Sequence, residues 1–333
     1  MNRAQATRRR FLTILGSVSA AGLIPSTYSA FATETKGVLR WSGRAMGADA
    51  SMVLAGLEPE VAQDLFSACA EEIDRLEGLF SLYRPGSTVS KLNRDGSVAG
   101  APQGFIALMR MSREISELTG GVFDPTVQPL WRLYADHFAD SRGSEGPAPA
   151  EIERVRDLVG YRGVKVDGET VSFARPGMAM TLNGIAQGYI TDRVTALLKE
   201  VGVGHVLVNM GEYAAIGSHP DGAPWRVGIR DPRNPFAAIE AVPLMDAALA
   251  TSGGYGTVFD RAGRFHHLFN PRTGASAARY ASVSVGHRSA AWADGLSTAF
   301  SAMSKPAISS VLAQLEGATA ILVGNDGEVI RLG

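Results

Sequence analysis

The sequence predicts an α+β fold, built as a single large domain with mixed or antiparallel sheets and packed helices. Segments with helical and strand-like periodicity interleave without a regular βαβ repeat, which disfavours a doubly wound parallel sheet. We find no internal repeat of roughly 20 to 50 residues. The 333 residues are 45% hydrophobic and 20% charged, with 38 Gly and 16 Pro, which is typical of a loop-rich globular protein.

Each element follows from its local pattern. Apolar residues at helical spacing predict a helix over Pro59–Phe80, and a second over Phe105–Leu118 that Gly120-Gly121 would end as a C-terminal cap. Two further helices are expected over Ile185–Val201 and Ala291–Met303. Extended segments are expected at Val38–Leu54, His205–Asn209, Trp225–Arg230, Ala281–Gly286 and Ala318–Val323, with a hairpin of Val164–Val166 and Thr170–Phe173 across Asp167-Gly168 and an exposed loop over Ser141–Ala150.

Charge and cysteine content exclude several classes of protein. The 32 basic and 33 acidic side chains give a formal net charge of −1, so no overall positive field is available to hold a nucleic-acid backbone. Cys69 is the single cysteine, which excludes an intramolecular disulfide and a thiolate metal cluster.

The N-terminus has the pattern of an export signal. Arg8-Arg9-Arg10 precedes a moderately apolar stretch that Pro25 interrupts, and Ala30-Phe31-Ala32 supplies small residues where a signal peptidase cleaves. We therefore expect a twin-arginine (Tat) signal peptide over residues 1–32, a mature domain over 33–333, and a soluble periplasmic protein. The alternative is a disordered basic tail.

A helical pair predicts a cation site. Asp294 and Thr298 lie four residues apart and would share one helix face, so a carboxylate and a hydroxyl could meet one hard cation. Magnesium prefers such oxygen ligands and keeps positions open for phosphate oxygens. The alternative is that Asp294 only caps the helix N-terminus.

Gly-rich turns and a histidine pair lie near other polar groups. The turns at 120–126, 183–189 and 251–255 would let backbone amides approach phosphates, although none matches a dinucleotide-binding fingerprint or a P-loop. His266 and His267 would point to opposite faces of a strand, which disfavours a shared zinc ion. One of them could donate to a phosphate or move a proton, and the alternative is a structural histidine.

In this order, the motifs resemble the flavin transferase (ApbE) family, the FAD:protein FMN transferases. The resemblance covers essentially the whole mature chain. It rests on Met46-Gly47, Ser81-x-Tyr83-Arg84-Pro85-Gly86-Ser87, Asn93, Gly121-x-Phe123-Asp124-Pro125-Thr126-Val127, Asn183-Gly184-Ile185-Ala186-Gln187-Gly188-Tyr189, Asn209-x-Gly211, Pro224-Trp225-x-Val227-Gly228-Ile229, Thr251-Ser252-Gly253-x-Tyr255, His267 to Gly274 and Ala293-Asp294-x-x-x-Thr298.

The resemblance implies an Mg²⁺-dependent enzyme that cleaves FAD, transfers FMN to a Thr or Ser hydroxyl of another exported protein and releases AMP. It implies that side chains of Asp294 and Thr298 and backbone oxygens of Gly184 and Ser297 bind Mg²⁺. It also implies that FAD contacts Met46, Tyr83, Asp124, Thr126, Thr181, Gln187 and His267. Asp294 and His267 are the two candidates for the group that takes the acceptor's proton.

Three departures from the family pattern stand close together. Gln187 occupies the place of the usual Lys, Asn183-Gly184 replaces Gly-Gly or Gly-Ala, and Thr181 stands where Asp is frequent. With the export signal, they resemble the NosX branch, which is associated with nitrous oxide reductase maturation and would imply a NosR-type membrane flavoprotein as acceptor. Two alternatives remain: a non-catalytic periplasmic flavin carrier or electron-transfer accessory protein, and an FAD pyrophosphatase that uses water in place of the acceptor hydroxyl.

Overall fold

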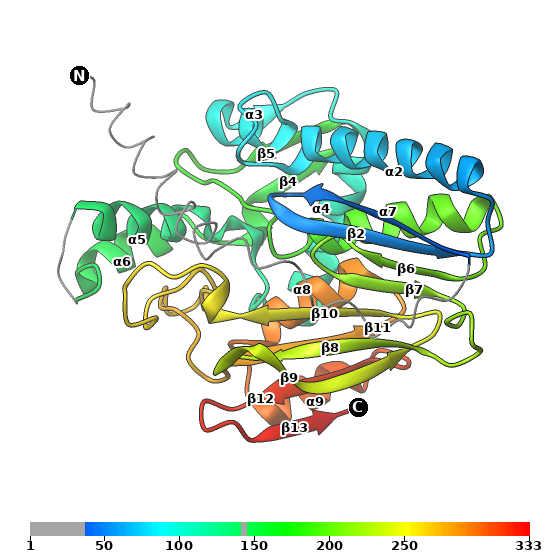
Figure 1. Ribbon diagram of the computed structural model, residues 1–333. Helices are drawn as coiled ribbons and strands as arrows, with labels where there is room; N and C mark the ends of the chain where they lie inside the picture. The colour runs from blue at the N-terminus through cyan, green and yellow to red at the C-terminus, as the bar shows by residue number, and fades with distance from the viewer. Residues whose placement is uncertain (1–36, 141–144) are drawn as a thin grey trace.

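The computed structural model describes residues 37–140 and 145–333 (Figure 1). The expected signal peptide over 1–32 lies outside the described residues. The helices are α2 (Pro59–Phe80), α3 (Thr88–Asp95), α4 (Gln103–Leu118), α5 (Gln128–Asp140), α6 (Pro149–Arg156), α7 (Ala186–Glu200), α8 (Ala290–Phe300) and α9 (Lys305–Leu312), with short 3-10 turns at Pro125–Val127, Tyr161–Gly163 and Gly254–Gly256. No helix within these ranges has the length and apolar character needed to cross a membrane.

An eight-stranded sheet forms the centre of the molecule. Its strand order is β1-β2-β6-β7-β10-β11-β12-β13, and every pair of neighbours is antiparallel. The strands are β1 (Val38–Ala45), β2 (Ala48–Ala55), β6 (Val206–Asn209), β7 (Tyr213–Ile216), β10 (Ala248–Gly253), β11 (Ser282–His287), β12 (Thr319–Val323) and β13 (Val329–Leu332). A three-stranded antiparallel sheet of β3 (Ser97–Val98), β5 (Thr170–Phe173) and β4 (Val164–Asp167) stands beside it.

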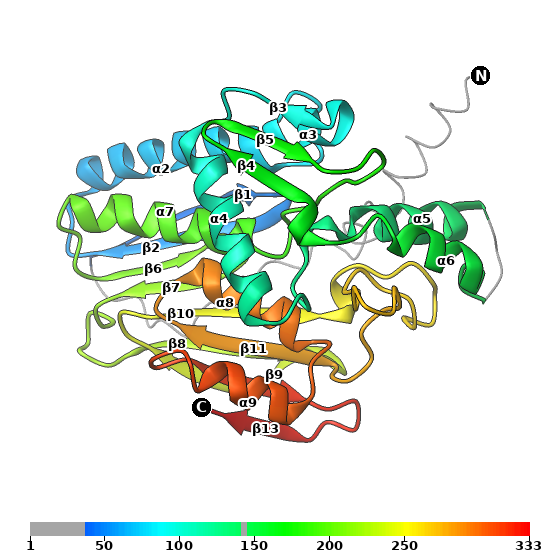
Figure 2. The same ribbon diagram turned by 180° about the vertical axis from the view of Figure 1, so that it is seen from behind.

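The two faces of the large sheet carry different layers. Successive strand residues point to opposite faces, so on β2 Met52 and Leu54 join the core beneath the helices while Val53 joins a second core. Figure 2 shows α7, α4, α8 and α9 lying over one face. The two-stranded hairpin of β8 (Trp225–Asp231) and β9 (Asn234–Leu244) covers the other, where Trp225 and Ile229 are buried.

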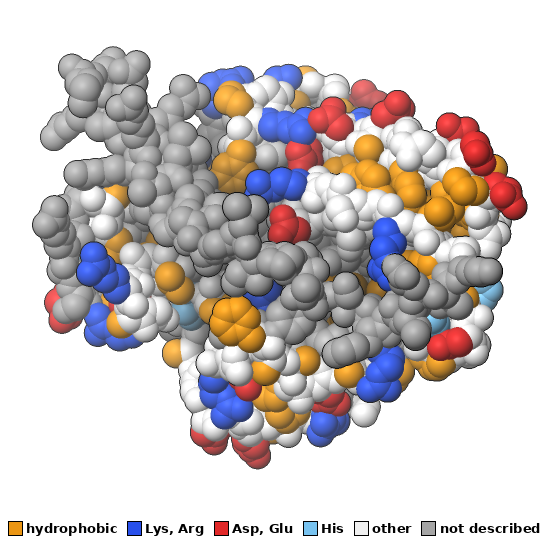
Figure 3. Space-filling model, viewed as in Figure 1, with side chains coloured by type: hydrophobic (Ala, Val, Ile, Leu, Met, Phe, Trp, Pro, Cys, Tyr) orange, Lys and Arg blue, Asp and Glu red, His pale blue; other side chains and the backbone are white. Residues whose placement is uncertain are grey.

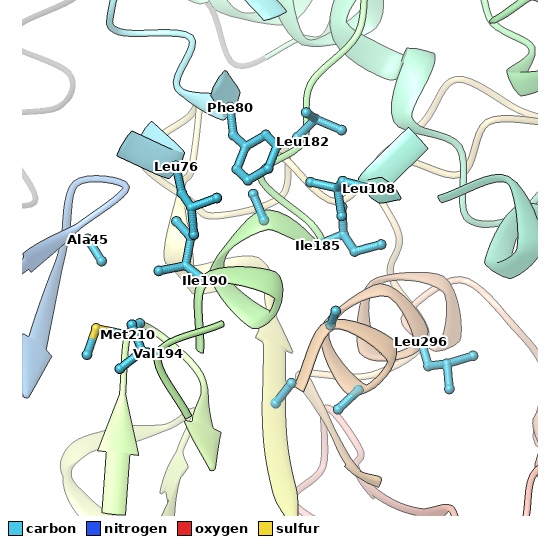
Figure 4. Close-up of a cluster of buried hydrophobic side chains, with 14 of the residues drawn as sticks. Ala45, Leu76, Phe80, Leu108, Leu182, Ile185, Ile190, Val194, Met210 and Leu296 are labelled. Carbon is cyan, nitrogen blue, oxygen red and sulfur yellow. The ribbon is translucent and has the colours of Figure 1, made fainter. Parts of the chain in front are cut away.

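The main core packs helices α2, α7 and α8 together. Figure 4 shows Ile185 and Ile190 from the α7 segment near Leu76 and Phe80 of α2, and the same buried cluster includes Val194 of α7 and Leu296 of α8. Complete burial of these side chains stabilises the fold by roughly 1.5–3 kcal/mol each. The helix layer therefore fixes α7 and α8 relative to one another.

The arm formed by α5 and α6 carries a separate aromatic cluster. Tyr134 of α5 is buried against Phe259, Phe265 and Phe269, which belong to the loop between β10 and β11. The arm lies at the left of Figure 1, beyond the ends of the strands of the large sheet. The cluster therefore anchors the loop that contains His266 and His267.

On the face shown in Figure 3, basic and acidic side chains are interspersed.

The predicted α+β class is confirmed, and its sheets are antiparallel. Helix α2 has the predicted bounds, and α4, α7 and α8 lie within one to three residues of theirs. The predicted extended start at Val38–Leu54 is instead two strands, because Met46 (φ 50°) and Gly47 (φ 86°) form a two-residue turn. The expected loop over Ser141–Ala150 was too long at its end, since α6 begins at Pro149; residues 141–144 lie outside the described ranges.

Candidate active site

Asp294 lies in the second turn of α8 and is only 3% exposed. The alternative interpretation, that Asp294 only caps the N-terminus of its own helix, is wrong, since Ser289 is the N-cap and accepts from the Trp292 N–H. The Oδ2 atom of Asp294 accepts a hydrogen bond of 3.0 Å from the Gly188 N–H of α7. The carboxylate is thus held at the junction of two helix N-termini.

A cluster of hydroxyl groups adjoins Asp294. Ser252 Oγ of β10 lies 2.7 Å from Ser297 Oγ and 3.3 Å from Thr298 Oγ1. Gly184 packs on Thr298 so closely that a Cβ there would lie 2.9 Å from Thr298 Oγ1. The structure therefore brings together all four residues predicted to bind a cation, Gly184, Asp294, Ser297 and Thr298, and adds the Ser252 hydroxyl.

Glu212 is a second buried carboxyl at this place, which the sequence reasoning missed. It lies between β6 and β7, is 8% exposed, and its Oε2 accepts from the Thr251 N–H at 3.0 Å. Burial, and then the charge of Asp294, raise the pKa of Glu212 well above its usual range. Burial also raises the pKa of Asp294 to about 7, with the Gly188 hydrogen bond opposing the shift and the Asp192 charge adding to it.

The donor set suits a hard cation. Carboxylate, hydroxyl and backbone oxygens are the ligands that Mg²⁺ prefers. Within residues 37–140 and 145–333, no group of three or more His, Cys, Asp or Glu residues could hold a metal ion. A cation here would therefore depend on the Ser and Thr hydroxyls and on backbone oxygens beside Asp294.

Gln187 extends from α7 to the turn between β6 and β7. It is the second residue of α7, and its side-chain amide packs against Gly211 in the turn that precedes Glu212. Gly211 has φ 102°, and a Cβ there would overlap the Gln187 amide. The turn between β6 and β7 is thus shaped to receive a long side chain from α7.

His267 belongs to the loop after β10, and it contacts Thr257, five residues after Ser252. Its Nδ1 lies 3.2 Å from the Thr257 carbonyl oxygen, and its ring abuts Gly256. Loss of solvation lowers the pKa of His267 to about 4, so the ring is neutral near pH 7. His266 instead packs over Gly254, and the two ring centroids lie 6.4 Å apart. The expected strand is wrong, since both histidines belong to the loop between β10 and β11, where His266 forms only an isolated bridge with Val258.

Asp124 and Thr126 form a hydrogen-bond network with each other and with the backbone at Gly160 and Tyr161. Asp124 Oδ1 accepts from the Thr126 N–H at 2.8 Å and from Thr126 Oγ1 at 2.6 Å, while Oδ2 accepts from the Tyr161 N–H at 2.8 Å. Thr126 Oγ1 in turn accepts from the Gly160 N–H at 2.7 Å. These side chains are engaged within the protein, so a contribution to ligand binding would act through the loop that they hold.

Of the remaining predicted residues, Thr181 connects the Asp124–Thr126 pair to the segment that contains Gly184. The Thr181 N–H donates to the Pro125 carbonyl at 2.8 Å, and Thr181 Oγ1 accepts from the Asn183 N–H at 3.2 Å. Tyr83, 45% exposed, hydrogen-bonds with the Asn183 side chain. Met46 lies further out, where its N–H donates to Glu77 Oε1 at 2.6 Å.

The fold is α+β, and its candidate active site is a cluster of acidic and hydroxyl side chains at two helix N-termini. A family model described as the ApbE family matches residues 46–322. The chain belongs to the ApbE family, as the sequence motifs indicated.

Relatives with established names agree with this assignment. The FAD:protein FMN transferase of Vibrio cholerae is 32% identical over 243 residues, which cover 70% of this chain and 72% of that protein. The enzyme of the same name from Salmonella typhimurium is 26% identical over 86% of this chain and 84% of its own length. The crystal structure of the ApbE protein from Thermotoga maritima superposes with a TM-score of 0.79 at 28% identity, covering 89% of this chain and 97% of that one.

Proposed function

We propose that this chain is an FAD:protein FMN transferase that uses Mg²⁺, attaches FMN to a Thr or Ser hydroxyl of another exported protein and releases AMP. The observation that carries the proposal is the meeting of Asp294, Thr298 and Gly184 with the Ser252 and Ser297 hydroxyls. The names of the relatives supply the reaction, and this cluster supplies a place for its cation.

Asp294 and Thr298 would hold Mg²⁺ through side-chain oxygens, and Gly184 and Ser297 through backbone oxygens. The chemistry that a bound Mg²⁺ supplies is neutralisation and polarisation of phosphoryl oxygens. Glu212 adds negative charge at the same place once ionised. Both carboxyls have raised pKa values without a cation, as expected of acids that lack a positive partner.

His267 is the better candidate for the proton acceptor. Its Nδ1 faces a carbonyl oxygen, so the ring proton belongs on Nδ1 and Nε2 is left as an acceptor. A neutral Nε2 can take the proton of an acceptor hydroxyl. The acceptor oxygen forms a bond to the FMN phosphorus, the phosphoanhydride bond breaks, and AMP leaves with the electron pair. Asp294 is assigned to the cation instead.

FAD would bind across the segments that contain Met46, Tyr83, Asp124, Thr126, Thr181 and Gln187. Tyr83 is exposed beside Asn183, where a planar ring could lie against it. Gln187 leaves the diphosphate without the lysine that the family usually provides, so the cation bears more of the charge compensation. We further propose export by the Tat pathway to the periplasm and a NosR-type acceptor, on the strength of the N-terminal motif and the NosX-like departures.

The decisive test incubates the mature chain with FAD, Mg²⁺ and a candidate acceptor domain, followed by a denaturing gel viewed for flavin fluorescence. Covalent fluorescence on the acceptor supports transfer. FMN and AMP without labelled acceptor would favour FAD hydrolysis, and tight flavin binding with neither product would favour a carrier. Thr298→Val is a suitable matched variant, because it removes one hydroxyl and keeps the side-chain volume. It should abolish labelling of the acceptor. Full labelling at unchanged Mg²⁺ dependence would contradict the assignment of Thr298 as a ligand of Mg²⁺.

A further inference from the structure

Helices α7 and α8 cap each other through two carboxylates. The Gly188 N–H of α7 donates to Asp294 Oδ2 of α8 at 3.0 Å, and the Ala290 N–H of α8 donates to Asp192 Oδ1 of α7 at 2.7 Å. On each helix the carboxylate lies four residues after the donating N–H, so donor and acceptor share one face. The contact is therefore reciprocal, with the same spacing on both helices.

Asp192 makes three hydrogen bonds to the start of α8. Beside the Ala290 bond, its Oδ2 accepts from Ser289 Oγ at 2.6 Å and from the Ala291 N–H at 3.0 Å. The first N–H groups of a helix have no partner within the helix, and a negative charge there is stabilising. A carboxylate of α7 therefore satisfies the N-terminus of α8.

The two backbones touch at this point. A Cβ at Gly188 would overlap the carbonyl oxygen of Ala290, so only glycine permits the approach that brings the Gly188 N–H to Asp294. Gly188 is in the first turn of α7, and Gly184, which packs on Thr298, lies just before that turn. A shift of α8 along α7 would separate Gly184 from Thr298 and Gly188 from Asp294 together.

We propose that Asp192 is a positioning residue of the cation site. It holds the N-terminus of α8 against α7, so that Asp294 Oδ2 stays on the Gly188 N–H and Oδ1 is left for the cation. The inference rests on the proposed function, since it presumes that Asp294 and Thr298 bind Mg²⁺. Asp192 itself does not touch the hydroxyl cluster; it acts through α8.

Asp192→Asn is the substitution that tests this role with the smallest change in side-chain shape. An amide has one acceptor oxygen, whereas Asp192 uses both of its oxygens, so the amide NH₂ would face either Ala290 or the Ser289–Ala291 pair. At least one helical N–H then meets another donor. Changes to groups that orient metal ligands typically lower metal affinity by about 10- to 100-fold.

The experiment measures the dissociation constant for Mg²⁺ by isothermal titration calorimetry of the mature chain with ADP, the part of FAD that lacks riboflavin and so cannot yield FMN. Asp192→Asn should raise this constant about 10- to 100-fold, and saturating Mg²⁺ should restore most of kcat. Val311→Ala in α9, a remote core truncation, is the matched control for lost stability; it should lower the melting temperature and leave the Mg²⁺ constant unchanged.

The possible outcomes distinguish the positioning role of Asp192 from the proposed Mg²⁺-dependent function. If wild type binds Mg²⁺ and Asp192→Asn binds it equally well, or if Val311→Ala weakens binding as much, the role of Asp192 is refuted and the proposed function stands. If wild type binds no Mg²⁺, both are refuted. Should Asp192→Asn fail to fold, Ser289→Ala takes its place. It removes the Oγ that donates to Asp192 and accepts from the Trp292 N–H but leaves the two backbone hydrogen bonds to Asp192, so a smaller rise in the constant is expected, and an unchanged constant overturns the inference.

Discussion

Replacing Asp294 by Asn tests whether this buried carboxyl makes the cation-free protein sensitive to pH. Burial is the largest cause that raises its pKa from 3.8 to about 7. Because the folded-state pKa lies above the unfolded value, the folded state binds the proton more tightly between these pH values. The free energy of unfolding therefore falls as pH rises through that window, by about 1.4 kcal/mol per pH unit for one such group.

The assay is urea-induced unfolding in EDTA at several pH values from 5 to 7. Asn removes the titrating group, while its oxygen can still accept from the Gly188 N–H. Wild type should lose about 2–3 kcal/mol more than Asp294→Asn across this range. An exposed control, Asp246→Asn, should lose as much as wild type. Equal pH dependence in wild type and Asp294→Asn would refute the reasoning.

Three further substitutions test the surrounding site. Gly184→Ala places a methyl group 2.9 Å from Thr298 Oγ1, so calorimetry should find Mg²⁺ binding weakened at least about tenfold; wild-type affinity would show that the two segments need not touch. His267→Gln removes the proposed proton acceptor, so labelling at saturating FAD should slow by about 10²- to 10⁴-fold, and an unchanged rate would transfer this role elsewhere. Gln187→Lys adds a cation beside Gly211 and Glu212 and should lower the KM for FAD about tenfold in steady-state labelling; an unchanged KM would place the diphosphate away from α7.

Local patterns predicted the elements whose signals are strong. Helix α2 was predictable to the residue because its apolar stripe continues over 22 residues and Pro59 stands at its start. Helix α3 was missed although Ser87 caps it and Gly96 ends it in the left-handed region, because its eight residues span only about two turns. The turn at Met46-Gly47 was missed because Met rarely adopts positive φ; here its N–H is held by Glu77.

Some residues of the candidate active site were likewise predictable from local spacing, and others were not. Asp294 and Thr298 could be paired from their spacing on one helix, since helical geometry brings residues four apart together. Glu212, Ser252 and Asp192 reach the site from a turn, a strand and another helix. Their convergence is a result of tertiary packing, and no spacing in the sequence encodes it.

The most direct test of the central claim is a crystal structure with Mn²⁺ in place of Mg²⁺ and ADP bound, with the metal located by its anomalous signal. The account predicts one peak in contact with Asp294 Oδ1 and Thr298 Oγ1, close to the Gly184 backbone oxygen, with ADP phosphate oxygens as further ligands at about 2.0–2.2 Å. A peak elsewhere, or ADP phosphates bound without metal at α8, would contradict it.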